Sequence, residues 1–298
     1  MTKCISLHRN TITIMSMNPI RFTKMHGISN DYIYINCMNG QPDCPPQLSI
    51  EMSDRHTGVG GDGIILICPS EIADFKMRIF NADGSEAKMC GNGSRCVGKY
   101  VYDKGLTDKT RVTLETLSGV KVLDLHLRDG MVDTVTVDMG EPVLFPPEIP
   151  VSFDGDSMID APVVSEGTGY RLTAVSMGNP HGVIFGGDPD TLPLENIGSA
   201  LECHPMWRDR ANIEFASILS PSEIKMRVWE RGSGETMACG TGACATVVAA
   251  VLNGLTGRTV TVHLRGGDLT IEWRPDDNHV YMTGGATTVF EGTYERRY

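Results

Sequence analysis

The sequence lacks the features that mark membrane and secreted proteins. No apolar run in its 298 residues approaches the roughly 20 residues that a membrane-spanning helix needs. Residues 1–20 lack the basic start and continuous apolar stretch of a signal peptide. The nine cysteines are odd in number and spread over a long chain, which argues against a disulfide framework. We therefore expect a cytoplasmic protein that does not associate with membranes.

The chain also lacks an excess of basic residues. Its formal net charge is −11, which argues against a nucleic-acid footprint or a polybasic membrane patch. With 41 % hydrophobic and 21 % charged residues, the composition is that of a globular protein, and the length allows two domains. We expect residues 1–16 to be a disordered extension. The sequence does not decide whether translation starts at Met1 or Met17.

The sequence does contain an internal repeat. FKMRIFNADGSEAKMCGNGS (75–94) matches IKMRVWERGSGETMACGTGA (224–243) at seven of twenty positions, where chance predicts roughly one or two. The same offset of 149 residues aligns Asn30 with Asn179. Convergent turn chemistry is the alternative, but the shared spacing favours a duplicated domain with two copies of one site around a pseudo-two-fold axis.

Strand patterns dominate both halves of the chain, and two segments have the pattern of helices. These segments are 91–104 and 240–253, and each begins directly after Cys-Gly and stops at a glycine, Gly105 or Gly254. The Pro-rich stretch 140–150 is the best candidate for a linker. The sequence thus predicts two strand-rich units, each wrapped around one buried helix.

The two repeated cysteines, Cys90 and Cys239, have the chemistry of an acid/base pair. A cysteine at a helix start lies near free N–H groups and the positive end of the helix dipole, so we expect its pKa to fall below about 8.5. The same N–H groups suit a substrate carboxylate, which the adjacent glycines allow to approach closely. A thiolate and a thiol on opposite faces of a carbon can remove and return its proton without any cofactor.

Cysteines can also pack in a core, bind zinc or form a disulfide. Cys96 and Cys244 lie inside the predicted helices, and we expect them to pack rather than react. Zinc binding by these two with Cys90 and Cys239 is disfavoured, because C-x5-C and C-x4-C are not the usual close spacings, and we expect no metal. A Cys90–Cys239 disulfide would be an oxidised, inactive form. A non-enzymatic thiol- or metal-binding protein remains an alternative.

Four segments carry a resemblance to a known family. KMHGISNDYIYIN, NADGSEAKMCGNGSRC, SMGNPHGVIF and ERGSGETMACGTGACA closely resemble the diaminopimelate epimerase family, over roughly residues 20 to 290. The resemblance implies an α+β fold of two pseudo-symmetric domains, each a mostly antiparallel sheet around a central helix. The last strand would return to the first domain, which gives 17–139 plus 285–298 for the domain carrying Cys90 and 140–284 for the one carrying Cys239.

The resemblance also implies an activity. It is the cofactor-independent epimerisation of LL-2,6-diaminopimelate to meso-diaminopimelate, which serves lysine and peptidoglycan precursor synthesis. The protein would bind a small amino-acid substrate, and a homodimer is compatible with the family. Related proteins with this fold act on histidine or hydroxyproline, so a racemase or epimerase of another amino acid is the second hypothesis.

The family's site residues transfer onto matching positions here. Cys90 and Cys239 are the implied acid/base pair, and Glu230 would pair with a substrate ammonium and, with His181, influence thiol protonation. The backbone of Gly91, Asn92, Gly240 and Thr241 would hold the reacting carboxylate. The distal amino-carboxylate would meet Asn81, Asn179, Asn212 and Arg231, with Asn30 as a further contact; retention of this set favours diaminopimelate.

Two positions depart from the family pattern. Gly63 stands where some members carry a glutamine that contacts substrate, so that contact would be lost or taken by water. Ser29 replaces a frequent glycine in the first motif, which we expect to alter the turn rather than the chemistry. Which of the two cysteines is ionised at rest, and which acts on which stereoisomer, stays open.

Overall fold

The computed structural model describes residues 19–296, which form strands, four α-helices and one short 3-10 helix. Up to residue 138 the strands are β1 (Ile20–Gly27), β2 (Asn30–Asn36), β3 (Gly63–Cys68), β4 (Phe75–Asn81), β5 (Glu86–Ala87), β6 (Arg111–Thr116), β7 (Gly119–Arg128) and β8 (Met131–Asp138). They are followed by β9 (Ala161–Ser165), β10 (Thr168–Ser176), β11 (Pro180–Phe185), β12 (Asn212–Ser220), β13 (Glu223–Glu230), β14 (Gly234–Glu235), β15 (Thr259–Leu264), β16 (Gly267–Trp273), β17 (Val280–Gly285) and β18 (Thr287–Tyr294). The helices are α1 (Pro45–Ser53), α2 (Gly91–Asp103), α3 (Leu194–Glu202), α4 (Gly240–Leu252) and η1 (Pro189–Thr191).

The strands pair in two copies of one pattern. In the first half, the part that carries Cys90, β1–β2, β3–β4, β6–β7 and β7–β8 are antiparallel, whereas β2–β3 and β4–β6 are parallel. In the second half, β10–β11, β12–β13, β15–β16 and β16–β17 are antiparallel, whereas β11–β12 and β13–β15 are parallel. The predicted duplication is therefore a duplication of topology, and the α+β fold is confirmed.

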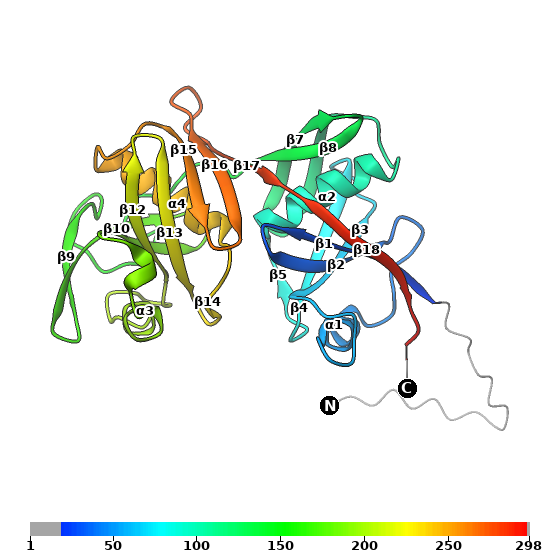
Figure 1. The fold of residues 1–298 in the computed structure, drawn as a ribbon, viewed down its shortest axis with the longest axis horizontal. Coiled ribbons are helices and arrows are strands. Elements are labelled where there is room, and N and C mark those ends of the chain that lie inside the picture. Colours follow the sequence, from blue (N-terminus) through cyan, green and yellow to red (C-terminus); the bar gives the residue numbers. More distant parts are fainter. Residues whose placement is uncertain (1–18, 297–298) are drawn as a thin grey trace.

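The two halves are joined by one strand pair. β8 and β17 are antiparallel, with Val137 opposite Met282 and Thr136 opposite Thr283, whose hydroxyl oxygens are 2.7 Å apart. Beyond β17 the chain crosses to the first half, where β18 pairs with β1 along its length (Figure 1). The domain limits 17–139 plus 285–298 and 140–284 stay a prediction, but this crossing puts the last described strand beside the first one.

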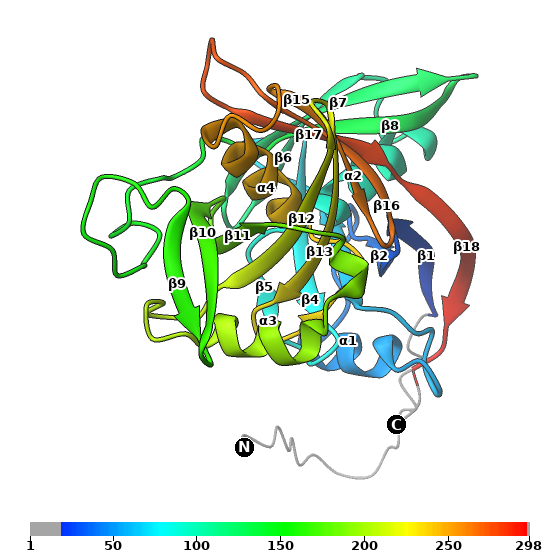
Figure 2. The ribbon, with the colours of Figure 1, turned by 60° about the vertical axis from the view of Figure 1, so that its left-hand side comes forward.

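Each half wraps its sheet around one helix, α2 or α4 (Figure 2). α2 contacts β1, β2, β7 and β8, and α4 contacts strands β10 to β12 and β15 to β17. The side chains of Ala243, Val247 and Ala250 are fully buried, as the all-round apolar sequence of 240–253 predicts. Cys96 and Cys244 are also fully buried, which confirms that they pack. The apolar cores of the two helices form one continuous cluster.

The same residue types begin and end both helices. Cys90 and Cys239 are the N-cap residues, and Gly105 and Gly254 adopt left-handed conformations (φ 69° and 68°) just past the ends. In both cases the glycine N–H and the N–H of the following leucine bond back to carbonyls of the last turn, which is a Schellman arrangement. The sequence prediction of both helices and their glycine stops is confirmed.

Two helices were missed from the sequence. α1 begins with two prolines, which are favoured in a first helical turn, and its Leu48 and Met52 pack on β3 and β4. α3 contains Gly198, which lets it lie against β13, since a Cβ there would be 2.7 Å from Trp229 Cβ. Each half therefore has a second, peripheral helix. Short helices of this kind depend on tertiary packing rather than on local pattern.

Two expectations concern the ends of the chain and the membrane. The predicted disordered extension, residues 1–16, lies outside the described residues. None of the helices in residues 19–296 is long and apolar enough to cross a membrane.

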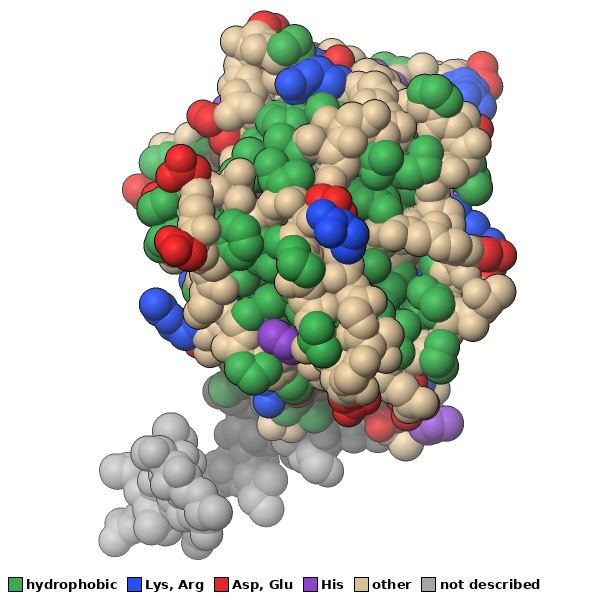
Figure 3. All heavy atoms as spheres, turned by 90° about the vertical axis from the view of Figure 1, so that its left-hand side faces the viewer, with side chains coloured by type: hydrophobic (Ala, Val, Ile, Leu, Met, Phe, Trp, Pro, Cys, Tyr) green, Lys and Arg blue, Asp and Glu red, His purple; other side chains and the backbone are tan. Residues whose placement is uncertain are grey.

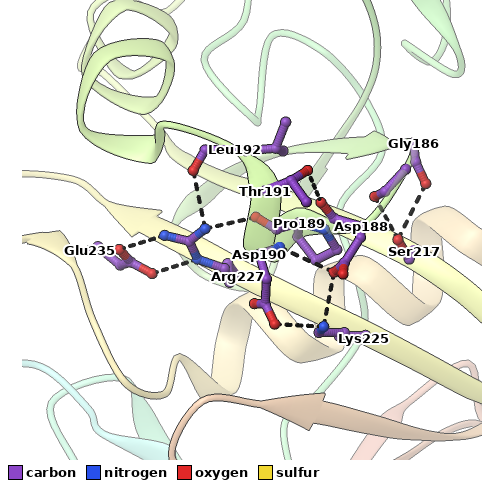
Figure 4. Close-up of polar contacts among 11 residues, drawn as sticks. Gly186, Asp188, Pro189, Asp190, Thr191, Leu192, Ser217, Lys225, Arg227 and Glu235 are labelled. Atoms are coloured by element: carbon purple, nitrogen blue, oxygen red, sulfur yellow. Dashed lines mark hydrogen bonds and ion pairs between the residues drawn. The ribbon is translucent and has the colours of Figure 1, made fainter.

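The repeated Lys-Met-Arg and Glu of the sequence have the same structural role in both halves. Arg227 forms a two-point ion pair with Glu235 (2.7 and 2.9 Å) that ties β13 to β14, the hairpin that leads into α4 (Figure 4). Arg78 and Glu86 make the same pair (2.8 and 3.1 Å) between β4 and β5, ahead of α2. Bidentate geometry of this kind fixes direction as well as distance. The pairs thus fix the two hairpins that precede Cys90 and Cys239.

Replacing Arg227 with methionine should lower the free energy of unfolding by about 1–3 kcal/mol, because the 12 %-exposed guanidinium also donates to the Pro189 and Leu192 carbonyls. Arg171→Met is the control, since the Arg171–Asp160 pair is 62 % and 51 % exposed and should contribute little. Urea unfolding of both variants tests this. Equal losses in the two variants would contradict the assignment.

Candidate active site

The N-termini of α2 and α4 meet at one side chain. A Cβ on Gly91 would lie 2.6 Å from Met282 Cε, and a Cβ on Gly240 would lie 2.9 Å from Met282 Sδ. Met282 belongs to β17, the strand that pairs with both halves. A side chain at the first position of either helix would have to displace the Met282 side chain, so the two helix starts that follow Cys90 and Cys239 both lie against the same methionine.

Cys90 is held by the first turn of its own helix and by the turn between β1 and β2. The Gly93 N–H donates to Cys90 Sγ (3.3 Å), and Cys90 Sγ donates to Asn30 Oδ1 (3.3 Å). Asn30 in turn donates through Nδ2 to Asp62 (2.7 Å). Ile28 and Ser29 have positive φ values of 49° and 69°, so Ser29 adopts a left-handed conformation that glycine adopts more readily. The sulfur thus faces amide groups and backbone N–H.

Cys239 lies in a more acidic environment. Its side chain is 4 % exposed and lies 3.5 Å from Thr241 Oγ1. The carboxylates of Glu230 and Glu214 both raise the pKa of its thiol. Glu214 is so close to the first turn of α4 that a Cβ on Gly242 would lie 2.6 Å from Glu214 Oε1.

The expected lowering of the two thiol pKa values is wrong for this structure. Burial raises the pKa of the Cys90 thiol, although the Gly93 N–H and the charge of Arg95 oppose it. Burial raises the pKa of the Cys239 thiol still further above its usual value, with Glu230 and Glu214 adding to it. The N–H groups at the helix start do favour the thiolate, as expected. The cost of removing a thiolate from water is nevertheless larger than the gain from one or two hydrogen bonds.

Glu230 connects the two cysteines. Its carboxylate acts on the pKa of Cys90 as well as on that of Cys239, and it accepts a hydrogen bond from Thr236 Oγ1. Burial raises the pKa of Glu230 itself, while contacts with Thr236 and Cys239 lower it. Glu230, at the end of β13, is therefore near the thiols of both halves.

His181 belongs to a buried chain of polar groups that the sequence revealed only in part. Its Nδ1 lies 2.7 Å from Glu214 Oε1 and its Nε2 lies 3.0 Å from Asn179 Oδ1. His181 and Glu214 are fully buried, and Glu214 Oε2 is without a hydrogen-bond partner in residues 19–296. Glu214 was not among the predicted site residues. The sequence signal that could have revealed it is a glutamate inside the strand-like run 211–219, because an unpaired charge in a buried strand is costly.

The remaining predicted contacts fall into two groups. In the second half, Asn212 accepts the Arg231 backbone N–H (2.8 Å), and the exposed Arg231 donates to the Asp209 carbonyl (3.0 Å), so these two lie together. In the first half, Asn81 ends β4 and donates to Ser85 (3.1 Å). Thr241 and Asn92 lie in the first turns of α4 and α2, beside Cys239 and Cys90.

Gly63 is fixed by its backbone surroundings. A Cβ at this position would lie 2.1 Å from the Phe80 carbonyl oxygen and 2.8 Å from the Tyr32 ring. No side chain fits there without a shift of the strand. The glutamine contact of other family members therefore has no counterpart at this position.

The cysteines of residues 19–296 carry no disulfide, and Cys90 and Cys239 are both free thiols. No group of three or more histidine, cysteine, aspartate or glutamate side chains in this part of the chain is arranged to hold a metal ion. The zinc alternative thus has no cluster of ligands here.

Comparison with known proteins decides the family. The family model described as diaminopimelate epimerase matches residues 22–145 and 173–289. The chain belongs to the diaminopimelate epimerase family. A diaminopimelate epimerase of Acetivibrio thermocellus is 56 % identical over 273 residues, covering 92 % of this chain and 98 % of the relative. One from Methanococcus maripaludis is 54 % identical and covers 92 % and 99 %.

Solved structures share the fold at low identity. A hydroxyproline epimerase from Agrobacterium vitis has a TM-score of 0.67 at 16 % identity, covering 92 % of this chain and 90 % of its own. A phenazine biosynthesis protein from Bacillus anthracis has a TM-score of 0.69 at 16 % identity, covering 94 % and 100 %. At this identity the likeness concerns the fold alone, and it agrees with the two-domain architecture of the diaminopimelate epimerase family.

Glu230→Gln should make Cys239 more reactive. Removing the carboxylate removes one of the groups that raise the Cys239 pKa, so the thiolate fraction and the initial rate of alkylation by iodoacetamide should rise severalfold at pH 8. Mass spectrometry of the Cys239 peptide measures this. Glu223→Gln is the matched control, because Glu223 begins the same strand and is exposed. Equal rates for Cys239 in the two variants would refute the role of Glu230.

Proposed function

We propose that this protein interconverts LL- and meso-2,6-diaminopimelate without a cofactor, using Cys90 and Cys239 as an acid/base pair. One observation carries the proposal: the two cysteines begin helices of opposite halves that meet at Met282, and Glu230 acts on both thiols. The family's curated members are diaminopimelate epimerases, which supports the substrate. The pathway would be lysine and peptidoglycan precursor synthesis.

The reaction needs one thiolate and one thiol at a time. The thiolate takes the α-proton from one face of the substrate carbon, and the thiol of the other half returns a proton to the opposite face, which inverts the centre. After one turnover the negative charge is on the other sulfur. The enzyme can then catalyse the reverse reaction directly, or it can catalyse the forward reaction again once the two thiols have exchanged protons with solvent. The two faces correspond to the two halves of the fold.

The carbanion formed between the two steps is stabilised by the helix starts. The backbone N–H groups of Gly91, Asn92, Gly240 and Thr241 lie in the first turns of α2 and α4, where the helix supplies no carbonyl for them, and they suit the carboxylate on the reacting carbon. Charge delocalised from the α-carbon into that carboxylate is then met by two converging dipoles. Burial of the site excludes the water that would otherwise compete for these donors.

Selectivity for diaminopimelate would come from the groups that bind its distal end. Arg231 can make a two-point contact with a distal carboxylate, and Asn81, Asn179 and Asn212 can donate or accept beside it. Asn30 and Glu230 would contact the substrate amino groups. His181, buried against Glu214, would act on thiol protonation from behind Cys239.

A racemase or epimerase of another amino acid is the second candidate, since the fold likeness extends to a hydroxyproline epimerase. Turnover on diaminopimelate, histidine and hydroxyproline separates the two. Exchange on hydroxyproline or histidine with none on diaminopimelate would replace the first proposal by the second.

We also propose a cytoplasmic homodimer. The free-thiol cysteines suit a reducing compartment. Among the described strands β18 pairs only with β1, which leaves its other edge unpaired, and the side chains of Val289 and Phe290 on this strand are exposed (54 % and 46 %). The face of the second half also carries hydrophobic side chains across much of its surface, with few charged ones near its centre (Figure 3). Sedimentation velocity of the protein and of Val289→Lys tests this: a monomer in both would refute the dimer.

Cys90→Ala and Cys239→Ala should each lose at least about 100-fold in epimerase turnover, since each removes one of two required proton carriers. Proton exchange at the α-carbon in deuterated water, followed by NMR with LL- and meso-diaminopimelate, measures both steps. Cys96→Ala and Cys244→Ala are the controls, because these cysteines lie on the same helices and only pack. Full turnover in either of the first two variants would remove the two-thiol mechanism.

The pH dependence should follow from the raised thiol pKa values. In the folded protein the thiolate that acts as base is scarce at neutral pH and becomes more abundant as the pH rises. We expect kcat/KM to increase about tenfold per pH unit between pH 6 and 8. A flat or falling profile over this range, measured with controls for stability, would show that deprotonation of a thiol does not limit the reaction between pH 6 and 8.

A further inference from the structure

Arg95 is a buried cation without a carboxylate partner. It lies on α2 one turn after Cys90, has 0 % exposure and is the largest fully buried side chain of the described chain. Throughout residues 19–296, no aspartate or glutamate forms an ion pair with its guanidinium. A charge taken out of water in this way is costly unless an anion compensates it.

Neutral groups accept the hydrogen bonds of Arg95. One terminal nitrogen donates to Asn92 Oδ1 (2.9 Å), Nε donates to the Gly285 carbonyl (3.3 Å), and the other terminal nitrogen lies 3.6 Å from Met282 Sδ. These contacts fix the guanidinium between the first turn of α2 and strand β17. They involve each of its three nitrogens but leave its positive charge unneutralised.

Four acidic groups lie close enough to Arg95 to interact with its charge: Cys90, Cys96, Cys244 and Tyr34. Burial raises the pKa of Cys96 to about 11 and that of Cys244 to about 12, and it raises the pKa of Tyr34 well above its usual value. These three are therefore neutral near pH 7 to 8. Burial raises the pKa of Cys90 too, but its sulfur also accepts the Gly93 N–H (3.3 Å), so its anion is stabilised by a hydrogen bond as well as by the charge of Arg95.

Arg95 also reaches Cys90 through hydrogen bonds. It holds the amide oxygen of Asn92, so that Asn92 Nδ2 is turned toward Asn30 Oδ1 (3.5 Å), the oxygen that Cys90 Sγ contacts at 3.3 Å. The titratable groups of other elements that act on Cys90 are Tyr32, Tyr34 and Glu230. Burial raises the pKa of Tyr32, so Tyr32 stays neutral, and Glu230 is the carboxylate that opposes Arg95.

The second half has no such cation. The offset of 149 residues places Cys244 at the position of Arg95, Glu214 at that of Ile65, and Glu230 at that of Asn81. Strand pairing supports this alignment, because Ile64 is opposite Phe80 in the first half and the residues 149 positions later, Ile213 and Trp229, are opposite each other in the second half. The two cysteines thus occupy equivalent backbone positions in environments of opposite charge.

We propose that Arg95 is a positioning residue whose buried charge makes Cys90, and not Cys239, the thiol of the pair that loses its proton first as the pH rises. The proposal deepens the proposed function, on which it rests for its catalytic meaning, but not for its test. Arg95 touches no reacting atom, and it acts by stabilising the sulfur anion and by orienting Asn92.

The first experiment uses the unmodified protein. Initial rates of iodoacetamide alkylation are measured from pH 6 to 10 at low conversion, with the Cys90 and Cys239 peptides quantified separately by mass spectrometry. Cys90 should reach half of its maximal rate at a lower pH than Cys239. The reverse order, or coincident profiles, would overturn the proposal without any variant being needed.

The second experiment separates charge from packing. Arg95→Gln removes the charge but keeps a donor for Asn92, and it should lower the alkylation rate of Cys90 at pH 7.5 by about tenfold while leaving the Cys239 profile unchanged. Arg95→Lys keeps the charge and should retain a Cys90 profile close to that of the unmodified protein. Cys244→Ala, at the equivalent position of α4, is the control and should change neither profile.

Each outcome is decisive. An unchanged Cys90 profile in a folded Arg95→Gln, or a shift in Arg95→Lys as large as in Arg95→Gln, would show that the charge is not the cause. If Arg95→Gln does not fold, Arg95→Lys and the order of the two cysteines in the unmodified protein decide. Because alkylation requires no turnover, a protein that shows the Cys90 shift but does not epimerise diaminopimelate would refute the proposed function and leave the role of Arg95 standing.

Discussion

The antiparallel pairing of β8 with β17 is the constraint on which the site depends. It joins two half-structures that otherwise have separate sheets, and its register puts Val137 of one half opposite Met282 of the other. Met282 then lies between the glycines that start α2 and α4. Because a one-residue slip would turn Met282 to the other face of the sheet, the ladder of backbone hydrogen bonds in this pair fixes how closely the two helices approach.

Close approach has an electrostatic cost. Glycines at the helix starts leave the N–H groups accessible to a carboxylate. The absence of side chains there also lets neighbouring segments pack closely over both sulfurs. Desolvation then raises the thiol pKa values, and the N–H groups recover only part of this. A site of this kind keeps its thiols protonated until a charged ligand or a pH change favours the thiolate, which also protects them from alkylation and oxidation.

Duplication preserved the backbone and let the charges diverge. The Arg78–Glu86 and Arg227–Glu235 pairs and the two glycine-stopped helices are the same in both halves. Behind the cysteines, by contrast, Tyr32 and Ile65 of one half stand where His181 and Glu214 of the other form a buried pair. Because the two environments differ, the two thiols differ in their affinity for the proton.

The sequence by itself determined the duplication, the α+β class, both central helices with their glycine ends, and the two cysteines at equivalent positions, because these depend on local pattern and spacing. It did not reveal α1 and α3, whose short helices form through packing on the sheet, or Glu214 as a neighbour of His181. Only the tertiary structure decided the sign of the thiol pKa shifts and the isolation of Arg95 from carboxylates. Both follow from burial, which depends on how distant segments enclose a group and not on the residues beside it in the chain.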